Sequence, residues 1–92
     1  MIRSFRCRDT QALYEGHRVR RFASFTAQAE ARLERLDAAH RLGDLAVLRS
    51  NHLEALKGNR KGQYSIRINM QWRICFEWRA DGPFNVEIVD YH

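Results

Sequence analysis

Polar and apolar residues alternate in two segments of the second half of the chain. Residues 63–69, QYSIRIN, and residues 72–80, WRICFEWRA, each place every second side chain on an apolar face. This period of two is typical of strands that are buried on one face only. A turn at residues 81–83 and a further strand-like segment, NVEIVDYH, follow. The pattern predicts an antiparallel sheet whose apolar face holds Tyr64, Ile66, Ile68, Trp72, Ile74, Phe76 and Trp78 and whose wet face holds Arg67, Arg73, Cys75 and Glu77.

The first half of the chain has the period of a helix instead. Apolar residues recur from Phe22 at spacings of 3, 4, 4 and 3, which predicts a helix from Phe22 to about His40. Asp9 is a suitable N-cap for a shorter helix that Gly16 would end, and a helical turn is expected over residues 42–48. Residues 1–6 alternate in polarity and predict a short first strand.

This order of elements predicts an α+β fold, a small antiparallel β-sheet with two N-terminal helices packed on one face. At 92 residues, the chain is expected to form a single domain over residues 1–92. The longest apolar runs are far shorter than the roughly 18 residues of a membrane span. The first residues also lack the apolar core of a signal peptide. We therefore expect a cytoplasmic protein without membrane contact. Two cysteines and four scattered histidines predict neither a disulfide framework nor a metal site, and no cofactor is expected.

The charge of the chain points towards an acidic partner. Sixteen basic residues, all but two of them arginine, face eleven acidic residues, which gives a net charge of +5. Residues 41–62 alone carry five basic and two acidic side chains, a net +3. Arginine has a planar fork of donors that matches phosphate, so nucleic acid is a candidate partner. A solubilising surface, or a face that binds an acidic protein, would produce the same excess.

The last four residues, VDYH, include three groups that can transfer protons. RNA cleavage through the ribose 2′-hydroxyl requires an acid, a base and fixed cations near the phosphate. His92 suits the acid because neighbouring negative charge favours the imidazolium, Asp90 could orient the ring or act as base, and Tyr91 could stack on a base or donate a proton. The alternative is that these residues are a frayed terminus without a function.

Basic side chains that could hold a phosphate lie in two places. Arg73 is in the middle of a predicted strand, where solvation is the simpler explanation. The segment KGNRKG brackets its basic residues with glycines, which would let backbone amides approach a phosphate, although a plain hairpin explains it equally well. The candidate phosphate-binding residues are Lys57, Arg60, Lys61, Arg67 and Arg73.

The alternation leaves the direction of the terminal side chains open. Val86, Ile88, Asp90 and His92 share one parity, so a regular strand would send Asp90 and His92 towards the apolar face. Either the strand bends past the edge of the core, or Tyr91 alone points towards the face of Arg73.

Three stretches, MIRSF, HLEALKGNRKGQYSIRINMQWRICFEW and NVEIVDYH, together resemble the HigB toxins, in particular their GraT-like branch, within the RelE superfamily. The resemblance covers almost the whole chain. It implies a small α+β toxin of a type II toxin–antitoxin system that cuts mRNA in the ribosomal A site without a metal and so inhibits translation. It also implies a HigA-type helix-turn-helix antitoxin, through which alone operator DNA would be bound.

Carried over by position, the resemblance assigns functional roles to Lys57, Arg73, Asp90, Tyr91 and His92. Many relatives have a functional histidine where this chain has Glu54, which could act as a base but would repel RNA phosphate, so a milder activity is expected. His52 is two positions earlier, on the same face if the segment is extended. The rival hypotheses are a basic module that binds ribosome or nucleic acid without cutting, and a pure protein-interaction domain.

Overall fold

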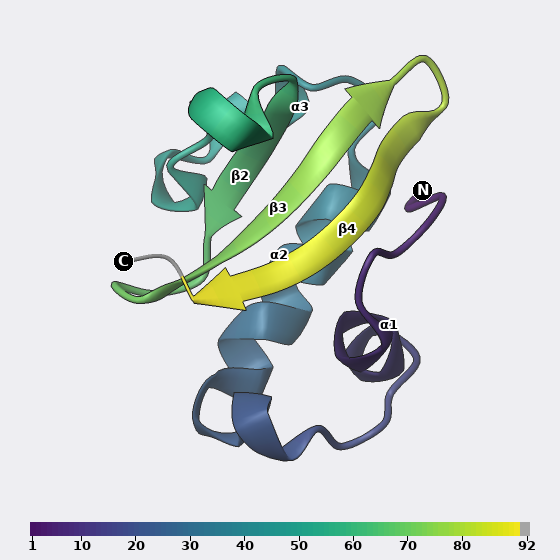
Figure 1. Ribbon diagram of the computed structural model, residues 1–92, viewed down its shortest axis with the longest axis vertical. Coiled ribbons are helices and arrows are strands. Elements are labelled where there is room, and N and C mark those ends of the chain that lie inside the picture. The colour runs from purple at the N-terminus through teal and green to yellow at the C-terminus, as the bar shows by residue number, and fades with distance from the viewer. Residues whose placement is uncertain (91–92) are drawn as a thin grey trace.

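A four-stranded antiparallel sheet organises the computed structural model, which describes residues 1–90. Its strands, β1 (Glu54–Ala55), β2 (Gln63–Arg67), β3 (Trp72–Arg79) and β4 (Gly82–Asp90), lie side by side in chain order (Figure 1). Short connections suffice because each strand pairs with the next one along the chain. The predicted sheet and the α+β class are confirmed.

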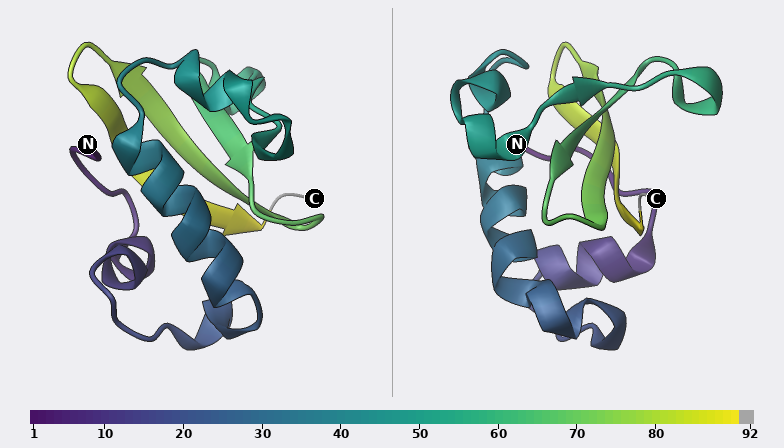
Figure 2. Two further views of the ribbon diagram at one scale, coloured as in Figure 1. Left: turned by 180° about the vertical axis from the view of Figure 1, so that it is seen from behind. Right: turned by 90° about the vertical axis from the view of Figure 1, so that its left-hand side faces the viewer.

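All helical elements except one 3-10 turn precede the sheet in the chain, and the longer helices cover one of its faces. They are α1 (Arg8–Tyr14), the 3-10 helix η1 (Arg20–Phe25), α2 (Thr26–Ala38) and α3 (Asp44–Val47), with two further 3-10 turns, η2 (Arg49–Asn51) and η3 (Gly58–Arg60). α2 runs across the sheet, and α1 lies near β4 (Figures 1 and 2). Their apolar sides and the inner face of the sheet form one core, which includes Leu13, Phe22, Leu33, Leu36, Ile66, Ile74, Phe76, Val86 and Ile88.

The predicted first strand is wrong. Within the described chain, residues 1–6 form no strand and make only an isolated parallel bridge between Phe5 and Val86. The backbone N–H of Arg6 donates to the carbonyl of Val86 over 3.0 Å, and that of Val86 donates to Ser4 over 3.1 Å. The pairing stops there because β4 is irregular at Asn85, whose φ of 53° breaks its regular ladder.

The predicted long helix begins later than its apolar pattern suggests. Residues 20–25 form the 3-10 helix η1, and the non-helical φ of −135° at Phe25 separates it from α2. Both apolar rings, Phe22 and Phe25, still reach the core, because a 3-10 turn also places residues three apart on one side. The predicted N-cap is also shifted: Cys7 occupies that position of α1, and Asp9 instead accepts a hydrogen bond from Arg21 Nε over 2.8 Å.

The turn between β3 and β4 depends on a glycine. Gly82 has a φ of +125°, and a Cβ atom there would lie 2.9 Å from the carbonyl oxygen of Met1. The N-terminal segment can therefore pass close to this hairpin, where the N–H of Arg3 donates to the Pro83 carbonyl over 2.8 Å. No helix among the described residues is both long enough and apolar enough to cross a membrane.

Candidate functional site

Two arginines lie opposite each other on the face of the sheet that α2 does not cover, here called the outer face. Arg67 on β2 pairs with Arg73 on β3 in the antiparallel register, so their side chains share this face. Both are half-buried. Like charges at directly opposite positions repel each other, so other groups must hold the two guanidiniums in place.

Arg73 is held by two hydrogen bonds to neighbouring segments. Its Nε donates to Ser65 Oγ over 2.7 Å, and its Nη2 donates to the carbonyl oxygen of His52 over 2.5 Å. Ser65 is fully buried, so its hydroxyl is a fixed acceptor. A guanidinium anchored in this way needs little reorganisation to meet an anion.

Arg67 is anchored around the turn that joins β2 to β3. Its Nε donates to the carbonyl oxygen of Asn69 over 3.2 Å, and its Nη2 contacts Met70 Sδ. Its Nη1 lies 3.4 Å from His52 Nε2. His52, Arg67 and Arg73 thus form one group on the outer face, which we call the arginine–histidine cluster.

The sequence pattern did not predict the turn through which His52 joins this group. His52 was expected to share the face of Glu54 only if the segment were extended, whereas it has a left-handed backbone, with φ 46° and ψ 53°, at the end of η2. The left-handed turn lets its carbonyl oxygen meet Arg73 while its ring meets Arg67. Only the Asn51-His52 dipeptide hinted at it, since both residue types tolerate this conformation better than most.

Glu54 lies on the same face as the cluster. It is on the short edge strand β1 and pairs with Ser65, so its side chain also belongs to the outer face. It is exposed. The structure therefore places a carboxylate on the same face as the Ser65–Arg73 anchor.

Only part of the predicted basic loop points its charge outwards. Lys57 and Lys61 flank η3 and are exposed, and η3 lies in the connection between β1 and β2 (Figure 2). Arg60 instead crosses the outer face, where its Nη1 lies 2.9 Å from Glu87 Oε1 and donates to Gln63 Oε1 over 3.0 Å. A partner phosphate would have to compete with Glu87 for this guanidinium.

The outer face is drier than the alternation predicted. Ser65 and Cys75 are fully buried although they share the parity of Arg67 and Arg73. Burial raises the pKa of the Cys75 thiol to about 11, and the guanidinium of Arg60 only partly opposes this effect. The expectation of a uniformly wet face is wrong at these two positions.

The predicted catalytic terminus is described only as far as Asp90. Asp90 pairs with Trp72, one residue before Arg73, and its Oδ2 accepts a hydrogen bond of 3.0 Å from Gln71 Nε2. The alternation therefore continues to Asp90, which is exposed and has the parity of the apolar face. Tyr91 and His92 lie outside the described residues.

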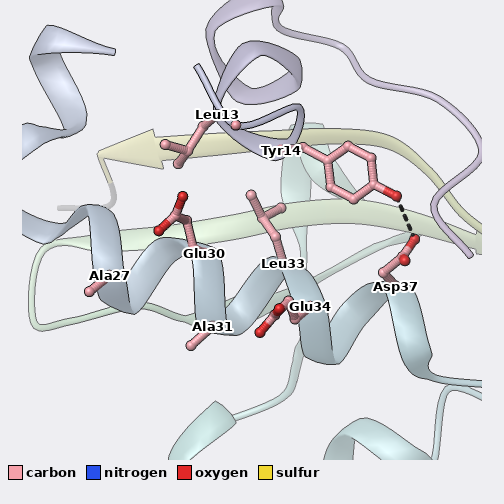
Figure 3. A pocket seen from close by; sticks show the side chains of 9 residues that line it. Leu13, Tyr14, Ala27, Glu30, Ala31, Leu33, Glu34 and Asp37 are labelled. Carbon is pink, nitrogen blue, oxygen red and sulfur yellow. Dashed lines mark hydrogen bonds between the residues drawn. The ribbon is translucent and has the colours of Figure 1, made fainter. Parts of the chain in front are cut away.

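A cavity of about 430 Å³ lies on the helical side of the molecule, between α1 and α2. Figure 3 shows the side chains of Glu30, Glu34 and Asp37 around it, with the Tyr14 hydroxyl donating to Asp37 over 3.0 Å. Burial and the neighbouring Asp37 carboxylate raise the pKa of Tyr14. These carboxylates would repel a phosphate, so the cavity does not suit RNA.

The described residues hold no cluster of three or more histidine, cysteine or carboxylate side chains that could bind a metal ion. Their chemistry at the outer face therefore consists of cations, hydrogen-bond donors, one imidazole and carboxylates. Such a set can bind a phosphodiester and move protons.

The chain is similar to proteins of one family over nearly its whole length. The family model described as RelE-like toxin of type II toxin-antitoxin system HigB matches residues 3–92. Toxin HigB-1 of Vibrio cholerae is 44% identical over 61 residues, which are 66% of this chain and 63% of that protein. Endoribonuclease HigB of Proteus vulgaris is 31% identical over 93 residues, which span both chains completely.

Proposed function

Because this chain belongs to the HigB-like family of RelE-like toxins in type II toxin–antitoxin systems, we propose that it is an endoribonuclease that cuts mRNA on the ribosome. A toxin of this type has an antitoxin as its partner. The similarity over the full length of Endoribonuclease HigB of Proteus vulgaris supports the proposed activity.

The observation that carries this proposal is the anchored guanidinium of Arg73. When the 2′-oxygen attacks phosphorus, negative charge accumulates on the non-bridging oxygens of the phosphorane. A cation that is already held in place stabilises that charge more than it stabilises the ground state. The bonds to Ser65 and His52 fix Arg73, and Arg67 adds a second positive charge on the same face.

The remaining candidate residues fit supporting roles. In this proposal the terminal residues Asp90, Tyr91 and His92 supply proton transfer and a stacking surface, with His92 as the acid that protonates the leaving 5′-oxygen. Glu54 adds a carboxylate to the outer face, which makes it one candidate for the base. Lys57 and Lys61 contact RNA phosphates through their exposed side chains, and Arg60 does so by exchanging Glu87 for phosphate.

The partners follow from the same proposal. The ribosomal A site presents a bent, unpaired codon, which a shallow sheet face cannot impose on RNA by itself. The antitoxin is of the HigA type, with a helix-turn-helix, and operator DNA is bound only through it. The protein acts in the cytoplasm, where it meets ribosomes.

One observation favours an alternative without cleavage. Glu54 puts a negative charge on the outer face, where it weakens phosphate binding. A basic module that occupies the ribosome without cutting would tolerate this charge. Its function would be lost when Lys57 and Lys61 are replaced and kept when the proton-transfer groups are replaced. A pure protein-interaction domain would keep its function in both cases.

Mapping of mRNA 5′ ends after induced expression distinguishes these functions. We expect new ends within translated codons for the wild-type protein and their loss in Arg73→Ala and in a variant that lacks His92. Arg79→Ala is the matched control, because Arg79 is also on the outer face of β3 but is paired with Glu77 over 2.7 Å. Growth arrest without new mRNA ends would contradict the nuclease and favour the binding module.

A further inference from the structure

We propose that His52 is the group that accepts the proton of the ribose 2′-hydroxyl. This inference rests on the proposed nuclease function and adds a residue to its site. Three observations carry it: the backbone conformation of His52, the position of its ring beside Arg67, and the bond between its carbonyl oxygen and Arg73.

The backbone of His52 is held in a conformation that most residues avoid. Its φ of 46° is one of two positive values at non-glycine residues in the described chain, the other being that of Asn85. Such positions have a cost in stability and often occur at functional sites. Two bonds maintain the conformation, from the N–H of His52 to the Arg49 carbonyl over 3.0 Å and from Arg73 Nη2 to the His52 carbonyl. The position of the imidazole is thus tied to the phosphate-binding arginine.

The ring of His52 presents an acceptor nitrogen to the cluster. A guanidinium can only donate, so the contact between Arg67 Nη1 and His52 Nε2 requires a lone pair on Nε2. At 3.4 Å this contact is long, and Arg67 has two other partners, Asn69 and Met70. An anionic phosphate oxygen is a much stronger acceptor than a neutral imidazole. Bound RNA would therefore draw Arg67 to its phosphate and leave Nε2 open to the 2′-hydroxyl.

The proposed step balances without a cofactor. Nε2 of His52 takes the proton of the 2′-hydroxyl while the 2′-oxygen forms a bond to the adjacent phosphorus. The bond from phosphorus to the 5′-oxygen breaks, and that oxygen takes a proton from the acid or from water. The products are a 2′,3′-cyclic phosphate and a 5′-hydroxyl end. No electron acceptor is needed, because neither end is oxidised.

His52 has an advantage over Glu54 in this role. Both side chains are exposed, and Glu54 shares the outer face with the cluster. A carboxylate places a negative charge close to the phosphodiester and repels it, whereas a neutral imidazole adds none. His52 also contacts both arginines, through its ring and its carbonyl oxygen, and these contacts couple proton transfer to phosphate binding.

The glycine variant His52→Gly tests the proposal without disturbing the turn. Glycine adopts a positive φ readily, so the backbone bond to Arg73 should survive while the imidazole is removed. We expect single-turnover cleavage of ribosome-bound mRNA to fall about 10²- to 10⁴-fold, the usual contribution of a proton-transfer group. Added imidazole should restore part of this rate in His52→Gly and leave the wild-type rate unchanged. His52→Asn, which also tolerates the turn but does not accept a proton near neutral pH, should be as slow as the glycine variant.

The controls separate this proposal from the nuclease assignment. His40→Asn removes another exposed imidazole and should keep the wild-type rate. If the wild-type protein cuts mRNA and either His52→Gly or His52→Asn cuts it equally fast, His52 is not the base. That result would leave the proposed nuclease function in place. A slow His52→Gly that imidazole does not rescue also overturns the role of His52, because a purely structural role would behave in that way. A wild-type protein that cuts no message overturns both proposals.

Discussion

Arg73 is anchored to the neighbouring strand by Ser65, whose Oγ accepts a hydrogen bond of 2.7 Å from Nε. The hydroxyl is fully buried and Arg73 is half-buried, so the bond fixes the guanidinium before any substrate arrives. The candidate site therefore depends on an uncharged residue that contacts no substrate itself.

We predict that Ser65→Ala lowers cleavage about 10- to 150-fold, because one hydrogen bond to a charged group contributes roughly 1.5–3 kcal/mol. The measurement is the rate on ribosome-bound mRNA, with urea unfolding to confirm that the fold is kept. Ser50→Ala is the matched control, since its hydroxyl also meets an arginine, Arg35 at 3.3 Å, at an exposed position. Equal losses in the two variants would contradict the role of the anchor.

Arg73→Ala should reduce cleavage far more than Arg79→Ala, although the two alternate to the same face. Arg79 is the last residue of β3, next to the turn that leads to β4. In the structure it is paired with Glu77 and stacked on the Phe84 ring at 4.6 Å. An RNA phosphate would therefore have to compete with these partners for its guanidinium. Its guanidinium holds the pKa of Glu77 below the usual range. Similar losses at both sites, with circular dichroism unchanged, would mean that only the overall charge matters.

The two cysteines should differ sharply in reactivity towards a thiol reagent at pH 8. Burial raises the pKa of Cys75 to about 11, so only about one molecule in a thousand carries its thiolate. Burial also acts on Cys7, but hydrogen bonds to Thr10 and Asp9 and the charge of Arg21 outweigh it and lower the pKa. We expect one fast equivalent at Cys7 and a second only after unfolding, as measured by mass spectrometry of labelled peptides. Fast labelling of Cys75 in the native protein would contradict its burial on the outer face.

Asp44 should contribute to acid sensitivity of the fold. The backbone N–H groups of Arg41 and His40 donate to its carboxylate and hold its pKa below the ordinary 3.8. A depressed pKa stabilises the fold above the unfolded value and loses this contribution as the pH falls through the folded value. Asp44→Asn should therefore be less stable than wild type at pH 7, with a difference that shrinks in thermal unfolding as the pH falls below 3.8. A constant difference across this range would contradict the assignment.

Cleavage should depend on the ribosome and on salt. Pre-positioning of reacting groups can be worth roughly 7–11 kcal/mol, and in the proposed mechanism the ribosome bends the RNA backbone. We expect little cleavage of naked mRNA, strong cleavage of the same message on ribosomes, and a decrease as salt screens the phosphate contacts. Equal rates on free and ribosome-bound RNA would indicate a self-sufficient nuclease.

The strands of the sheet were predictable because their alternation is strict. Tyr64 to Ile68 and Trp72 to Trp78 needed no other information, since only a strand places every second side chain on one face. The first segment failed because Phe5 has the right local pattern but meets an irregular part of β4. Whether this segment pairs depends on a strand some eighty residues away in the sequence. The local pattern of polar and apolar residues carries no information about that strand.

The candidate site was predictable in its residue types but less so in its geometry. Arg67 and Arg73 come together because their strands are adjacent and their parity is equal. Arg60 meets Glu87, and His52 turns back towards Arg73, through contacts between segments that are far apart in sequence. The left-handed turn at His52 depends on these contacts, so the sequence pattern alone misplaced it.

The pairing of the first residues with β4 also bears on when this protein becomes active during its own synthesis. The N–H of Ile88 donates to Thr10 Oγ1 over 2.9 Å, and the N–H of Arg6 donates to the carbonyl of Val86. The first residues can therefore make these contacts only after β4 has been synthesised. Contacts so distant along the chain form late in folding. β3, which carries Arg73, also lacks one of its two neighbours until β4 has been made. A ribosome that translates this message has therefore read the codons of β4 before the arginine–histidine cluster gains its stable support, which separates synthesis from activity in time.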